Sequence, residues 1–244
     1  MSVTLAELAI HIPDSIHLFE RYDLDYYQNG KQTFKEACCE KGLPYAELDA
    51  ELAYLQNRSG KHSLTLEDLS IDRLIDFING QFHANETEIL NFIHNSILQL
   101  LAEKSCDAIH LKMLEEVEQK FAKLKKKLIM HCEKEDEILF PYIRKLLELR
   151  RDKTSLSPQT ISIIKNPIRI LEAEHVQASQ ILADIKRTAG QFSIPADVPK
   201  EYVMLMQSLR KFEHDLHMHL HIENNILFPK LIALEEELNT KIKH

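Results

Sequence analysis

Two stretches of this sequence repeat one arrangement of residue types that can bind metal. Residues 131–141 and 219–229 both follow the pattern His-x-x-x-Glu-x-x-Ile-Leu-Phe-Pro. On an α-helix, a His and a Glu four residues apart lie on the same face, where both can reach one metal ion. Imidazole and carboxylate ligands without a thiolate suit iron, manganese or zinc rather than softer metals. The repeat therefore predicts two equivalent halves of one metal site.

The candidate ligands stand where the apolar stripes of the predicted helices continue through the core. In residues 107–149 the stripe that ends at Leu128 continues as His131 and Glu135, and residues 200–238 repeat this arrangement. Positions on such a stripe face the interior of a helical bundle. Together with single histidines in the other two helical patterns, the inward-facing candidates are His83, His131, Glu135, His175, His219 and Glu223.

A single histidine or glutamate in a protein core more often has an ordinary hydrogen-bonding partner than a metal ion. However, the two glutamates and three of the histidines (His131, His175 and His219) lie at one depth and leave no basic partner on the stripes, while His83 lies on the shoulder of its apolar face. Buried carboxylates without a partner cost several kcal/mol each, which a marginally stable fold does not tolerate. Because a bound dication would remove that cost, we favour a metal site over a set of ordinary core residues.

Four nearby polar residues receive other interpretations. His217 and His221 lie two residues from stripe positions, so we expect both to face solvent, with a contact to a ligand as the lesser alternative. For Glu174, next to His175, we favour a plain surface glutamate over a partner of a ligand, and the second interpretation stays open. Cys132 follows a candidate ligand but should point elsewhere.

The Ile-Leu-Phe-Pro end of each repeat has a structural interpretation. Ile138 and Ile226 should return their helices to the apolar stripe below the metal site. Pro141 and Pro229 each remove one backbone donor and should kink the helix just past the ligands.

The composition is that of an all-α protein with a core of its own. The 244 residues are 44% hydrophobic and 28% charged, with five glycines and no tryptophan. The net charge of −8 argues against nucleic acid or an anionic membrane as a partner. No apolar run approaches the ~18 residues of a membrane span, and the N-terminus does not resemble a signal peptide. The four cysteines form no C-x-x-C pair, so we expect reduced thiols in the cytoplasm.

Helical periodicity divides the chain into two parts. Residues 1–56 contain short helical patterns and predict a small helical N-terminal module. The polar stretch 57–63 is interpreted as a linker. Beyond it, from residue 64 to residue 244, four long helical patterns predict an antiparallel four-helix bundle. Those patterns cover residues 70–104, 107–149, 166–187 and 200–238.

Together these motifs resemble the hemerythrin-like di-iron proteins of the Repair of Iron Centres family. The resemblance rests on the two repeats, on the QFH and EAEH motifs that contain His83 and His175, and on the N-terminal stretch FERYDLDYYQNGKQTFKEAC. It covers nearly the whole chain, and the ENNILFP match is highly specific.

The resemblance implies a pair of iron ions, joined by an oxo or hydroxo bridge, inside a four-helix bundle. In that family each iron is held by two histidines, and two glutamates bridge the pair. Carried over, His83 and His175 match the single histidines of the first and third helices, and the two repeats match the paired motifs. The family is linked to bacterial survival of nitrosative and oxidative stress and to the repair of iron–sulfur clusters.

One departure from the family concerns the N-terminal module. The family typically carries a Cys-Cys pair after an Asp-Tyr, whereas this sequence has Tyr27 and Gln28 there. A role of the module that depends on those thiols is therefore in doubt. Because all six candidate ligands follow the linker, a chain that begins near Leu64 should keep the iron centre.

Three functions stay open at this point. The first is repair of iron–sulfur clusters by iron donation or NO handling, and the second is enzymatic reduction of NO or peroxide. The third is a carrier or sensor of O2 or NO, which we rank lower because hemerythrins usually hold a fifth histidine where Ser179 stands. The expected partners are these small molecules and damaged iron–sulfur proteins, and a homodimer is left open.

Overall fold

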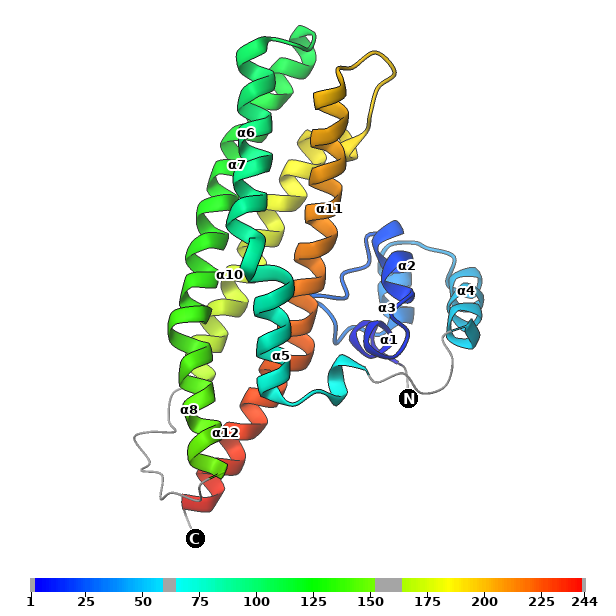
Figure 1. Cartoon of the computed structure of the whole chain (residues 1–244). Helices are drawn as coiled ribbons and strands as arrows, with labels where there is room; N and C mark the ends of the chain where they lie inside the picture. Colours follow the sequence, from blue (N-terminus) through cyan, green and yellow to red (C-terminus); the bar gives the residue numbers. More distant parts are fainter. Residues whose placement is uncertain (1–2, 59–64, 152–163, 243–244) are drawn as a thin grey trace. The chain divides into compact units, whose positions relative to one another are not determined.

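The computed structural model describes residues 3–58, 65–151 and 164–242, and helices dominate it (Figure 1). Among the described residues, the one extended pairing is an isolated bridge between Thr4 and Thr33. The all-α prediction is therefore confirmed. Within the described parts of the chain, no helix is both long and apolar enough to cross a membrane.

The chain divides into two compact units. The first consists of Met1–Leu74 with His217–Ala233, and the second of Ile75–Leu216 with Leu234–His244. Most of the predicted linker, at residues 59–63, lies outside the described residues. The division into a module at 1–56 and a bundle at 64–244 stays a prediction.

The N-terminal part of the first unit is built from short helices around its own apolar core. Thr4 and Thr33 start two of these helices with capping boxes, in which each threonine and a glutamate three residues later exchange hydrogen bonds. The core includes the buried rings of Phe19 and Tyr26, whose centroids lie 5.9 Å apart. The elements are α1 (Leu5–His11), α2 (Ser15–Arg21), α3 (Phe34–Glu40), α4 (Tyr45–Arg58) and the 3-10 turn η1 (Leu66–Asp68).

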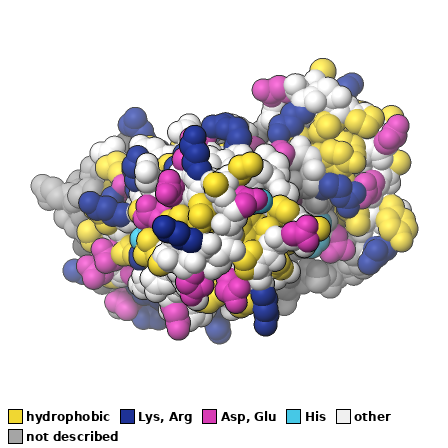
Figure 2. Space-filling model, turned by 90° about the horizontal axis from the view of Figure 1, so that it is seen from above, with side chains coloured by type: hydrophobic (Ala, Val, Ile, Leu, Met, Phe, Trp, Pro, Cys, Tyr) yellow, Lys and Arg dark blue, Asp and Glu magenta, His cyan; other side chains and the backbone are white. Residues whose placement is uncertain are grey.

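The second unit is a helical bundle, as predicted. Its α6, α7, α10 and the first part of α11 run side by side (Figure 1), and α7 packs against both α6 and α10. Phe121 of α7 meets Phe212 of α11 with ring centroids 6.0 Å apart. The helices are α5 (Ile71–Ile78), α6 (Ala84–Glu103), α7 (Ala108–Lys134), α8 (Phe140–Arg151), α10 (Lys165–Thr188), α11 (Lys200–Ile222) and α12 (Phe228–Ile242), of which α5, α11 and α12 extend into the first unit. On the face shown in Figure 2, basic and acidic side chains are interspersed.

Three π-helical turns interrupt the described helices, and each one begins or ends at a candidate ligand. They are η2 (Asn79–His83), η3 (Glu135–Leu139) and η5 (Glu223–Leu227). In η3 and η5 the N–H of the following phenylalanine bonds the carbonyl five residues back, at Glu135 or Glu223. Pro141 and Pro229 come next and have no N–H to donate to an earlier carbonyl. The wider π turn accommodates this missing hydrogen bond. The structure thus has a π turn directly before each of these prolines, and the predicted kinks stay a prediction.

A π turn contains one extra residue, so it rotates every later side chain around the helix axis. Ile138 is 67% exposed, whereas Leu139 is 4% exposed. The prediction that Ile138 returns to the core is therefore wrong, because the turn passes that role to Leu139. Ile226 is buried, as predicted.

This register generates a test of the turn at Glu135–Leu139. We expect Leu139→Ala to lower the free energy of unfolding by about 2–5 kcal/mol, because it empties a core position. Ile138→Ala, on the same turn, should change it by less than about 0.5 kcal/mol, as exposed positions usually do. Urea unfolding of the metal-free variants measures both. A larger loss from Ile138→Ala than from Leu139→Ala would instead show a regular α-helix at this point.

Candidate metal centre

The structure gathers the six predicted ligands into two groups that share two members. His83, Glu135, His219 and Glu223 form one group. His131 and His175 form the other with the same two glutamates, and within each group the ligand atoms lie within 4.8 Å of one another. Glu135 and Glu223 belong to both groups, so the arrangement has the residue types and the spacing of a metal site.

All six side chains are withdrawn from solvent. Glu135 and Glu223 are fully buried, and the side chain of His83 is only 3% exposed. The remaining histidines are buried as well. The inward orientation that the stripes predicted is confirmed, and it puts polar atoms where only a cation or a polar partner can satisfy them.

His83 is oriented by a carboxylate that the sequence did not single out. Its Nδ1 lies 2.8 Å from Oδ1 of Asp136, which can only accept, so Nδ1 carries a proton. The other ring nitrogen, Nε2, then faces Glu135 and lies 3.5 Å from its Oε2. An imidazole nitrogen and a carboxylate oxygen at this distance can both coordinate one cation between them. Asp136 comes 53 residues after His83, so no local sequence pattern predicts this contact.

His131 has a similar support. Its Nδ1 lies 3.2 Å from Oε2 of Glu174, and its Nε2 lies 3.4 Å from Oε2 of Glu135. The interpretation of Glu174 as a plain surface glutamate is therefore wrong. Partial burial alone would raise the pKa of Glu174, but hydrogen bonds from Lys134 and His131 outweigh it, and the pKa is lowered. An ionised Glu174 keeps the Nδ1 proton of His131 in place.

The donor set fits a metal ion. Nε2 of His131 lies 2.9 Å from Nε2 of His175, a distance at which both nitrogens cannot carry a proton. Either one donates to the other, or both direct lone pairs at a shared cation. Nε2 of His219, on α11, lies 2.9 Å from Oε1 of Glu223, the first residue of η5. Neutral imidazoles and carboxylates at these spacings are the ligands that iron, manganese and zinc prefer.

Of two further predictions about nearby residues, one is confirmed and one is wrong. Cys132 points away from the candidate ligands, as predicted, and its buried thiol donates to Oε2 of the buried Glu86 at 2.6 Å. His221 is buried rather than solvent-facing, and this burial lowers its pKa to about 4. The ring that covers it belongs to Tyr26, with centroids 5.3 Å apart. A contact with a residue so distant in sequence leaves no trace in helical periodicity.

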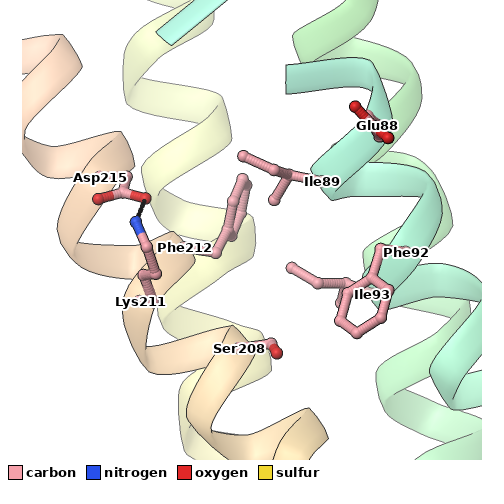
Figure 3. Close-up of a pocket in the computed structure, with 8 residues that line it drawn as sticks. All are labelled: Glu88, Ile89, Phe92, Ile93, Ser208, Lys211, Phe212 and Asp215. Atoms are coloured by element: carbon pink, nitrogen blue, oxygen red, sulfur yellow. Dashed lines mark hydrogen bonds and ion pairs between the residues drawn. The ribbon is translucent and has the colours of Figure 1, made fainter. Parts of the chain in front are cut away.

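A surface pocket in the second unit is separate from this centre. It has a volume of about 360 Å³ and opens between α6 and α11 (Figure 3). Phe92 and Phe212 are among its apolar side chains, and the Lys211–Asp215 ion pair lies at its rim. It contains none of the candidate ligands.

The support of His83 leads to a prediction about metal affinity. We expect Asp136→Ala to weaken metal binding by about 10–100-fold, because His83 loses the partner that fixes its tautomer and orientation. Glu137→Ala, the adjacent exposed carboxylate, is the matched control and should bind like the wild type. Anaerobic titration of the metal-free protein with Fe(II) measures both. An Asp136→Ala variant with unchanged affinity would contradict the assigned role.

Comparisons with known proteins place this arrangement in a family. The sequence model described as "Hemerythrin HHE cation binding domain" matches residues 85–231, which include five of the six candidate ligands and begin just after His83. Curated iron–sulfur cluster repair proteins YtfE from Enterobacter sp. (strain 638), Citrobacter koseri and Escherichia coli O8 are each 30% identical over 231 residues. Each alignment covers 95% of this chain and 97% of the relative. The chain belongs to the hemerythrin-like family of cation-binding proteins that includes these iron–sulfur cluster repair proteins.

Proposed function

We propose that this chain is a di-iron protein of the nitrosative and oxidative stress response that helps to repair damaged iron–sulfur clusters. The observation that carries the proposal is the pair of ligand groups that share Glu135 and Glu223. Two shared carboxylates are what a bridged pair of irons requires. The name of these relatives, iron–sulfur cluster repair protein, supports the same function. The proposed ligands are His83, His131, Glu135, His175, His219 and Glu223.

The residues around the centre would prepare it for iron. Asp136 and Glu174 hold protons on the far nitrogens of His83 and His131, which leaves their Nε2 atoms available as ligands. Burial of all the ligands keeps bulk water away from the centre. When bound, two irons would supply redox chemistry and an open position for a diatomic molecule such as NO or O2.

An apolar surface pocket on the helices that carry Glu135 and His175 supports small uncharged molecules as partners. It has a volume of about 390 Å³, and apolar atoms form almost all of its surface. Leu139 and Leu171 line it, each about one helical turn from Glu135 or His175. Lys134 also lines it and bonds the Glu174 that orients His131. A diatomic molecule of low polarity would find a favourable environment there.

The state of the cysteines supports a cytoplasmic location. None of the four cysteines, all of which lie in the described residues, forms a disulfide; two are buried and two are at least partly accessible. Free thiols persist most readily in a reducing compartment, where damaged iron–sulfur proteins are also found. We therefore include the cytoplasm in the proposal.

Metal content provides the first test. The reconstituted wild-type chain should hold about two irons, and Glu135→Gln should hold fewer, because an amide is a far weaker bridging ligand than a carboxylate. Glu133→Gln changes an exposed glutamate two residues away and should keep the wild-type content. Elemental analysis with protein quantitation gives the ratios. A wild-type chain that holds one iron or none would contradict a di-iron centre.

Repair activity provides the second test. A purified enzyme whose [4Fe–4S] cluster has been damaged by NO should recover activity faster with the iron-loaded wild-type chain than with Glu135→Gln. Free iron at the same concentration is the control, since repair by simple iron release would match it. Sustained consumption of NO under reductant, without recovery of the damaged enzyme, would favour a reductase instead.

A further inference from the structure

The loop between α2 and α3 is bonded to the helix that carries His219 and Glu223. Asn225 donates through Nδ2 to the backbone carbonyls of Tyr26 and Tyr27, at 3.1 and 3.3 Å. Asn224 donates in the same way to the carbonyl of Tyr27, at 3.0 Å. All of these residues belong to the first unit. The asparagines lie inside the π turn that begins at Glu223, so the loop is attached to the turn itself.

The loop is shaped to approach the turn closely. Asp25 accepts hydrogen bonds from the backbone N–H of Gln28 and the side chain of Asn29, both at 2.8 Å, which closes the loop on itself. At Gly30, a Cβ atom would lie 2.5 Å from Oδ1 of Asn225, 2.8 Å from Cβ of Ala6 and 2.9 Å from the carbonyl oxygen of Tyr26. Only glycine leaves room for Asn225 at this point.

Two rings extend the contact along the preceding turns of α11. The ring of Tyr27 stacks on His217, with centroids 3.9 Å apart and planes 14° apart. Nδ1 of His221 lies 3.1 Å from Nδ2 of Asn225. His217 and His221 each lie about 200° around an ideal helix from His219. The loop therefore contacts the side of this helical segment that is opposite the side with the candidate ligands.

We propose that residues 25–30 form a clamp that fixes the π turn Glu223–Leu227 and thereby positions Glu223 and His219 for metal, with Asn225 as the main positioning residue. A π turn is a rare, locally unfavourable form of helix, and relaxation to an α-helix would rotate the two sides of the turn against each other. Bonds at its second and third residues oppose that rotation. The inference rests on the proposed function, because it takes both residues to be ligands.

The clamp also gives the N-terminal module a role that needs no thiol. Its contacts are backbone carbonyls and an aromatic ring, which Tyr27 supplies at one of the positions where the family typically has cysteine. The sequence predicted that a chain beginning near Leu64 keeps its iron centre. The clamp predicts the opposite, that the centre loses metal faster when this loop is released.

The test compares variants of the full-length iron-loaded chain in the presence of an excess of a chelator. Asn225→Ala should release iron about tenfold faster than the wild type, on the scale typical of residues that orient ligands. Gly30→Ala should have the same effect from the other side of the contact, by pushing the loop away from an unaltered helix. Lys230→Ala is the matched control. Lys230 also donates to two backbone carbonyls of the N-terminal part, those of Glu67 and Leu69, but it lies beyond the π turn.

Faster release from Asn225→Ala and Gly30→Ala, with wild-type release from Lys230→Ala, supports the clamp. Wild-type release from both Asn225→Ala and Gly30→Ala, or equal acceleration in all three variants, overturns it. If Asn225→Ala does not fold, Gly30→Ala decides. Iron content of the wild type before the chelator is added separates the two levels of inference, because a chain that never binds iron defeats the proposed function itself.

Discussion

Two carboxylates in an apolar interior are the constraint on which the rest of this structure depends. Moving each from water into a protein core costs several kcal/mol, a large part of the net stability of a domain. Glu135 and Glu223 are nevertheless fully buried. The helices place histidine nitrogens within 3.5 Å of these carboxylates, as at His83 and His219. A dication between such donors offsets the cost of burial and converts an unfavourable core into a binding site.

The π turns are the local device that makes this geometry compatible with long helices. A regular helix directs a side chain to the core every three or four positions, which leaves little freedom to adjust the direction of a metal ligand. An extra residue at Glu135 or Glu223 changes the phase between the ligand and the apolar stripe that follows. Leu139 then closes the core below the site, and Ile138 moves outward. The π turn also accommodates the proline that follows two residues after its end.

Support for the ligands comes from elements that are distant in sequence. Asp136 on η3 orients His83 at the end of η2, and Glu174 on α10 orients His131 on α7. In the first unit, the loop around Tyr26 and Tyr27 holds the turn that begins at Glu223. Each contact restricts a group that would otherwise sample several orientations, which is how a protein raises metal affinity without adding ligands.

The sequence by itself determined the all-α class, the approximate extent of the long helices and the burial of the six candidate ligands. These features depend on periodicity, which is a local property that a single chain displays directly. Only the tertiary structure decided the exposure of Ile138, the carboxylate partners of His83 and His131, and the burial of His221. The exposure of Ile138 depends on one extra residue in a turn, which shifts the phase without altering the composition. The partners and the buried histidine depend on contacts between residues 43 to 195 positions apart, which no helical pattern encodes.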